Sequence, residues 1–144
     1  MKRILSVALV LISFVAVTER SVNIERESKL RPRRIFYVLK TSWYGPGFHG
    51  RKTANGEVYN MHNLTAAHRT WPFGTKLRLI NPKENKTVVA VINDRGPYDP
   101  KYLTGKKKKL RPYPDRYLDV SYETAKELGM IRDGTAELLV EILR

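Results

Sequence analysis

The chain contains no cysteine among its 144 residues. This absence excludes disulfide bonds, thiol nucleophiles, cysteine metal sites and a lipid-acceptor cysteine after a signal sequence. Acidic residues are also scarce, because 14 Asp and Glu stand against 27 Lys and Arg and give a formal net charge of +13. Such a charge favours an anionic partner, although a basic surface that only keeps the protein soluble explains it equally well.

The sequence also lacks a glycine-rich nucleotide fingerprint, and its three histidines show no metal-ligand spacing. We therefore expect neither a cofactor nor a metal ion. A chain of this length favours one domain, and no internal repeat is visible.

The amino-terminal segment predicts export. Met1–Arg3 is basic, and the next 14 residues, 4–17, are uncharged and almost wholly apolar. Such a run is short for a membrane span but suits a signal peptide. The cleavage pattern at 16–18 is a poor match, so an uncleaved signal anchor stays open as an alternative. We expect residues 1–18 to be this signal segment, residues 19–34 a charged linker, and the product exported to the periplasm or cell envelope. Nucleic acid is therefore not expected as a partner.

Residues 35–144 are predicted to form a mainly β domain. Strands are predicted where β-branched and aromatic residues cluster or alternate with polar ones, at 35–44, 64–68, 75–80, 87–92, 117–120 and 136–143. By pattern alone residues 136–143 could also form a helix, because Leu, Glu and Ala favour one. Residues 75–93 are expected to form a hairpin. Ser121 is predicted to cap a short helix that Gly129 ends. Short strands with one helix favour a small closed β-barrel.

Two polar blocks carry residues that packing alone does not need. Thr41–Glu57 combines glycines with the aromatic residues Trp43 and Tyr44. Asn93–Pro97 follows a buried apolar run and puts the carboxyl group of Asp94 at the rim of the scaffold. Together the blocks predict a groove for a polar polymer with acid–base groups inside it.

Several blocks stand in the order found in rare lipoprotein A (RlpA)-like proteins, which the chain resembles: SWYGPGFHGRKTANGE, LTAAHRTWPFGT, VINDRGPY, YLDVS and AKELGMIRDGTA. The resemblance covers residues 41–143. It implies a small six-stranded double-psi β-barrel with one short helix. The best-known members of this family are septal lytic transglycosylases, so the resemblance also implies an enzyme that cleaves peptidoglycan.

The resemblance further implies a catalytic cluster at Glu57, His68 and Asp94. We expect Asp94 to be the acid, Glu57 to be the second carboxylate, and His68 to position one of them. The fourth family position is an Asp, but this chain has Asn60, which cannot titrate and can only orient a sugar hydroxyl.

Plain structural roles stay open for the same residues. Asp94 could cap a turn or pair with Arg95, Glu57 could be a solvated loop residue, and His68 could be a hydrogen-bonded structural residue. Trp43 and Tyr44 are candidates for stacking on sugar rings, although core packing explains Trp43 equally well. Substrate binding is expected at Asn60, Trp43, Tyr44 and Arg95. Asp119 in YLDVS is expected to tie a strand end to the helix.

The leading functional hypothesis is an exported lytic transglycosylase. It would cleave the bond between N-acetylmuramic acid (MurNAc) and N-acetylglucosamine (GlcNAc) without water and leave 1,6-anhydroMurNAc ends. The alternative, motivated by Asn60, is a non-catalytic, expansin-like module that binds cell-wall glycan. A third hypothesis is a basic envelope protein that recruits a partner through the loop Asp99–Arg116.

The expected partner is the peptidoglycan glycan strand, with an anionic envelope polymer as a further ligand of the lysine run Lys106–Lys109. We expect a monomer that is not a lipoprotein. Any attachment to a membrane would depend on an uncleaved signal.

Overall fold

The computed structural model describes residues 20–21, 34–99 and 111–143. The chain divides into two compact units between Arg34 and Ile35. The predicted signal segment, nearly all of the linker and the lysine run Lys106–Lys109 lie outside the described residues. Within the described part, no helix is long and apolar enough to cross a membrane.

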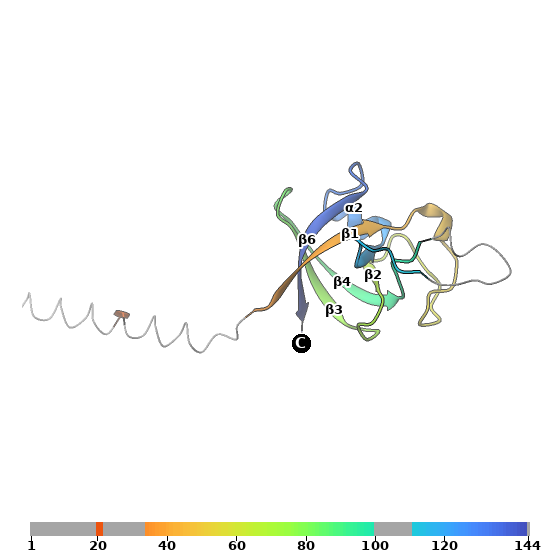
Figure 1. Cartoon of the computed structure of the whole chain (residues 1–144), viewed down its shortest axis with the longest axis horizontal. Helices are drawn as coiled ribbons and strands as arrows, with labels where there is room; N and C mark the ends of the chain where they lie inside the picture. The colour runs from red at the N-terminus through yellow and green to blue at the C-terminus, as the bar shows by residue number, and fades with distance from the viewer. Residues whose placement is uncertain (1–19, 22–33, 100–110, 144) are drawn as a thin grey trace, which may run out of the picture. The chain divides into compact units, whose positions relative to one another are not determined.

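The described residues of the second unit form a closed barrel of six strands (Figure 1). In chain order the elements are β1 (Phe36–Trp43), a 3₁₀ turn (Pro46–Phe48), β2 (Thr65–His68), β3 (Lys76–Asn81), β4 (Lys86–Asp94), β5 (Leu118–Val120), α2 (Tyr122–Glu127) and β6 (Thr135–Leu143). Around the barrel the strands run β1-β5-β2-β4-β3-β6. The predicted mainly β barrel with one short helix is therefore confirmed.

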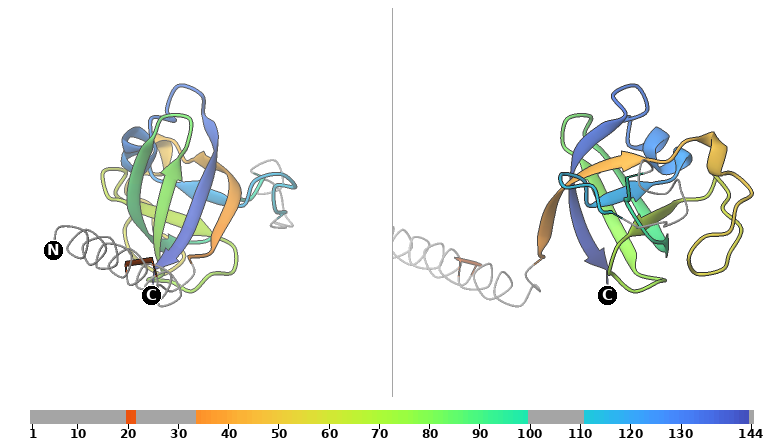
Figure 2. Two further views of the ribbon diagram at one scale, coloured as in Figure 1. Left: turned by 90° about the vertical axis from the view of Figure 1, so that its left-hand side faces the viewer. Right: turned by 45° about the vertical axis from the view of Figure 1, so that its right-hand side comes forward.

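Two of the neighbouring strand pairs are parallel, β1 with β5 and β2 with β4. Each pair joins segments that are far apart in the sequence. The hairpin predicted over 75–93 is also present, as the antiparallel pair β3 and β4. Figure 2 shows the long segment between β1 and β2 extending beyond the strands.

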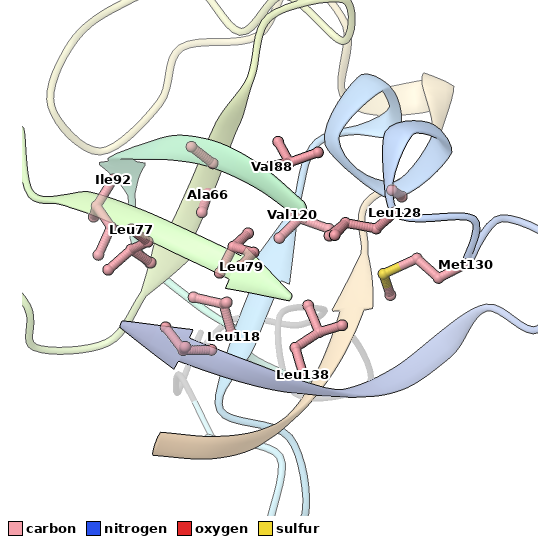
Figure 3. Packing of buried hydrophobic residues seen from close by; sticks show 13 residues of the cluster. Ala66, Leu77, Leu79, Val88, Ile92, Leu118, Val120, Leu128, Met130 and Leu138 are labelled. Atoms are coloured by element: carbon pink, nitrogen blue, oxygen red, sulfur yellow. The ribbon is translucent and has the colours of Figure 1, made fainter. Parts of the chain in front are cut away.

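Alternation along the strands fills the barrel with apolar side chains (Figure 3). In β3, Leu77 and Leu79 are fully buried, whereas Lys76 is exposed, because successive side chains of a strand point to opposite faces. Leu128 and Met130, which follow α2, complete the core cluster. Burying each large aliphatic side chain contributes about 1.5–3 kcal/mol, so this core gives the strand ends a rigid support.

Strand β4 carries one extra residue where it pairs with β2. Ala66 pairs with Ile92 but Ala67 pairs with Asp94, so Asn93 has no partner in the β2 register. An extra residue of this kind turns the following side chain to the other face of the sheet. The bulge therefore puts Asp94 on the same face as Ala67.

The helix begins as the sequence predicts. The Ser121 hydroxyl oxygen accepts a hydrogen bond from the Thr124 amide at 3.3 Å. The same hydroxyl donates to the Asn63 carbonyl at 2.6 Å, so it joins the helix to the segment before β2. Gly129 follows the helix at φ +72°, a conformation that glycine adopts without strain.

We expect Ser121→Ala to lower the free energy of unfolding by about 1–2 kcal/mol, because it removes the helix cap and the hydrogen bond to the Asn63 carbonyl. Urea denaturation of the full chain measures this change. The exposed Thr87→Ala serves as the control and is expected to change stability by less than about 0.5 kcal/mol. Equal stability of the two variants would contradict the cap.

Candidate active site

A cleft of about 280 Å³ opens beside the ends of β1 and β4. Aromatic side chains form much of its lining: Trp43, Tyr44, Phe48, Tyr59, Tyr98 and Tyr113. The acidic groups of the lining are Asp94 and Asp119, and the basic groups are Arg51, Lys52, Arg95 and Arg116. An apolar wall with a few converging polar groups is typical of a ligand-binding cleft.

The two aspartates face each other across β2. Ala67, which also lines the cleft, pairs with Asp94 of β4 on one side and with Asp119 of β5 on the other. Residues in register on neighbouring strands project to the same face, and neighbouring strands lie about 4.8 Å apart. The small methyl group of Ala67 therefore separates two carboxyl groups and leaves the space between them open.

Backbone amides hold the carboxylate of Asp94. Its Oδ1 accepts hydrogen bonds from the amides of Ala54 and Arg95, each at 2.8 Å. Ala54 belongs to a tight turn in which the Thr53 amide donates to the Glu57 carbonyl at 2.8 Å. A turn in the first polar block, Thr41–Glu57, thus fixes the carboxylate of Asp94 in the second block, Asn93–Pro97.

Asp119 is partly buried, and the hydroxyl of Ser42 on β1 donates to its Oδ1. Burial raises the pKa of Asp119, and the negative charge of Asp94 raises it further. The Ser42 hydrogen bond and the positive charge of Arg116 act in the opposite direction. Asp119 therefore keeps its proton to a higher pH than an ordinary Asp.

Asp119, which we expected only to tie a strand end to the helix, lines the cleft instead. The alternation of side chains along β5 would have indicated that Asp119 points away from the core. Leu118 and Val120 are both fully buried in the core, so the side chain between them must point away from it.

Glu57 does not line the cleft, but it binds the residue next to Asp94, which does. The Asn93 side chain donates from Nδ2 to Glu57 Oε2 at 3.0 Å, and the Asn55 amide donates to the Asn93 carbonyl at 3.3 Å. Glu57 therefore contacts the bulge residue next to Asp94. Asn60 is exposed, and its side-chain oxygen accepts from the His62 amide in a local turn.

His68 lies next to Ala67 on β2, but its side chain does not line the cleft. Its Nδ1 accepts from the amides of Thr70 at 3.2 Å and Trp71 at 3.0 Å, and its ring stacks on Trp71 at 3.9 Å. Burial lowers the pKa of His68 to about 4, and the positive charges of Arg69 and Arg95 add to the shift. His68 is therefore a neutral acceptor at neutral pH.

Of the proposed binding residues, Trp43 and Tyr44 line the cleft, where Trp43 packs edge-on against Tyr122 at 5.7 Å. Burial raises the pKa of Tyr44, so its hydroxyl is protonated. The guanidinium of Arg95 donates to the carbonyls of His68 at 3.2 Å and Trp71 at 3.0 Å, and so fixes the loop after β2.

The cleft brings together groups that can transfer protons. Among residues 34–99 and 111–143, no group of three or more His, Asp or Glu side chains is placed to hold a metal ion. Of the predicted catalytic residues Asp94, Glu57 and His68, only Asp94 lines the cleft, where Asp119 joins it. Two carboxyl groups between aromatic walls can donate and accept protons and stabilise positive charge on a bound ligand.

Protonation of His68 should destabilise the barrel in acid. Since its pKa lies near 4 in the folded state and near 6.5 otherwise, the unfolded state binds more protons between these values, and stability should fall as pH decreases through this window. We expect His68→Asn, which keeps an acceptor at the same place, to flatten the fall of Tm between pH 6.5 and 4. Thermal melts measure it. The exposed His49→Asn is the control, and an unchanged slope in His68→Asn would contradict this role.

Comparison with known proteins agrees with this architecture. The family model described as lytic transglycolase matches residues 37–140. Similar relatives are the probable endolytic peptidoglycan transglycosylases RlpA of Aquifex aeolicus, 47% identical over 103 residues, and Synechocystis sp., 44% identical over 103 residues. The endolytic peptidoglycan transglycosylase RlpA of Pseudomonas aeruginosa is 42% identical over 104 residues.

Each of these alignments covers 72% of this chain, but only 39%, 28% and 26% of the respective relatives. The chain thus spans about a quarter to two-fifths of their length. Among solved structures, the Streptomyces papain inhibitor superposes with a TM-score of 0.54 at 14% identity, over 76% of this chain and 96% of that one. This likeness concerns the fold alone. The extent of the family match shows that the chain belongs to the RlpA-like family of lytic transglycolases, built on a double-psi β-barrel.

Proposed function

We propose that this chain cleaves peptidoglycan glycan strands as a lytic transglycosylase. The observation that carries the proposal is the aromatic cleft with two carboxyl groups, Asp94 and Asp119, in a barrel of the RlpA-like family. The relatives are named endolytic peptidoglycan transglycosylases, and the chain matches one part of each. The activity of those whole proteins is therefore proposed for this chain.

The reaction needs two proton transfers and no water. The oxygen that leaves carbon 1 of MurNAc must gain a proton, and the 6-hydroxyl of the same sugar must lose one as it attacks that carbon. Positive charge at carbon 1 needs a negative group nearby. Asp94 suits this task because two amides fix its carboxylate at the cleft, where a sugar ring can lie against it.

The aromatic lining supports binding of a sugar chain. Trp43, Tyr44 and Tyr98 line the cleft, and aromatic rings can pack against the apolar sides of sugar rings. Arg51 and Lys52 can donate hydrogen bonds to hydroxyl and carbonyl oxygens of the glycan.

Glu57 and His68 act as positioning residues in this proposal. Glu57 accepts from Asn93, the bulge residue that turns Asp94 into the cleft. His68 Nδ1 accepts hydrogen bonds from two backbone amides of the loop after β2. The Arg95 guanidinium donates to the backbone carbonyl of His68 and so binds the same loop. Their loss would disturb the site by moving Asp94, even though neither side chain lines the cleft.

Because peptidoglycan lies in the cell envelope, a glycan substrate implies that the domain works there. The proposed form of the domain is a monomer. We also propose that the domain works in the periplasm and that Lys106–Lys109 contacts an anionic envelope polymer. Asn60 favours a second candidate, a binding module without catalysis, because the corresponding family residue is an Asp. The Asn60 side chain is exposed and accepts a hydrogen bond within a local turn. The experiment below decides between the enzyme and the binding module.

We expect the full chain to release fragments that end in 1,6-anhydroMurNAc from purified glycan strands, as mass spectrometry would show. Asp94→Asn should lower the rate by about 10²–10⁴-fold, because it removes a positioned acid–base group. Asp133→Asn, the same change at an exposed residue that pairs with Lys83, should leave the rate unchanged.

The products separate the alternatives. Fragments with a reducing MurNAc end would indicate hydrolysis in place of transglycosylation. Binding without any product would support the expansin-like module, and activity that appears only in Asn60→Asp would assign the loss to that position.

A further inference from the structure

Asp119 and Asp94 line the same cleft, on opposite sides of β2. The two residues flank Ala67 in register, although they come from β5 and β4. Ser42 binds Oδ1 of Asp119, which leaves Oδ2 as the other oxygen of the carboxyl group. This Oδ2 lies 3.7 Å from the position that a Cβ on residue 96 would take, and the glycine there keeps that space free.

The surroundings of Asp119 favour its neutral form. Partial burial disfavours the charge, and the fixed carboxylate of Asp94 disfavours a second negative group at the same cleft. The Arg116 charge and the Ser42 hydroxyl oppose this effect. A carboxyl group that burial keeps protonated, next to a carboxylate that backbone amides hold, can supply the acid and the base of one site.

We propose that Asp119 is the catalytic acid of this cleft and that Asp94 is its base. The assignment rests on the proposed cleavage of glycan. Asp119 Oδ2 gives its proton to the oxygen between the two sugars, the bond from that oxygen to carbon 1 of MurNAc breaks, and the electron pair stays on the leaving GlcNAc. The 6-hydroxyl oxygen of MurNAc bonds to carbon 1, and its proton passes to Asp94.

The cycle closes without another reactant. After the reaction Asp94 carries the proton and Asp119 the negative charge. Transfer of one proton from Asp94 to Asp119, directly or through solvent that enters as product leaves, restores the starting state. The residues implied by the family resemblance do not offer this acid, because Glu57 is outside the cleft lining and His68 is neutral with Nδ1 occupied by amides.

Two measurements on the full chain test the assignment. The first is the rate of 1,6-anhydroMurNAc formation in Asp119→Asn, which should fall by about 10²–10⁴-fold while binding to insoluble peptidoglycan is retained. Its Tm at pH 7 should be equal to or above that of the unchanged chain. The raised pKa of Asp119 costs stability at any pH above the pKa of an unfolded Asp, and an Asn at this position does not carry that cost. Asp133→Asn is the matched control.

The second measurement is the pH profile, which a purely structural role of Asp119 would not move. Activity should fall as pH rises through the pKa of Asp119. Ser42→Ala removes the hydrogen bond that lowers this pKa, so the alkaline limb of the profile should move to higher pH. Carbon-13 NMR of the carboxyl groups should show the same upward move, and a downward move of the Asp119 titration in Asp94→Asn.

The outcomes distinguish this assignment from the function on which it rests. No anhydro product from the unchanged chain would overturn both. A normal rate in Asp119→Asn, with the unchanged chain active, would overturn the assignment alone. Should Asp119→Asn be inactive because it is unfolded, an unmoved pH profile in Ser42→Ala would still overturn it.

Discussion

The extra residue in β4 decides what faces the cleft. Without Asn93 in the bulge, the register with β2 would put Asp94 on the opposite face from Ala67. The bulge turns the carboxyl group toward Asp119, and the barrel core beneath it, with Ile92 fully buried, fixes the strand that carries it. The pairing of two carboxyl groups across one alanine follows from this single irregularity.

The first polar block stabilises that irregularity. The turn at 53–57 donates an amide to Asp94 and another to the carbonyl of Asn93, and its Glu57 side chain accepts from the Asn93 amide group. A buried side-chain amide needs such a partner, since leaving it unbonded costs about 1–3 kcal/mol. A glutamate outside the cleft can therefore matter for catalysis through the position of another residue. This gives a physical reason for the two blocks to occur together.

Much of the fold could be predicted from the sequence because its signals are local. Alternation in β3 and the Ser121 cap with Gly129 at the helix end depend on neighbouring residues, and the six strands lie close to their predicted ranges. The bulge at Asn93 leaves no such pattern. Asp119 was missed because β5 has three residues, and its partners in register, Ser42 and Ala67, lie far away in the sequence. Strand order, which no local pattern encodes, brings these residues together.

Cleavage by Asp119 and Asp94 requires a sugar to lie between the two aspartates. A crystal structure of the full-chain Asp119→Asn variant with an uncleaved glycan fragment tests this most directly. We expect the oxygen between MurNAc and GlcNAc within about 3 Å of the residue 119 side chain and the 6-hydroxyl of MurNAc at the same distance from Asp94. A fragment bound along Glu57 or His68, with neither aspartate in contact, would contradict it.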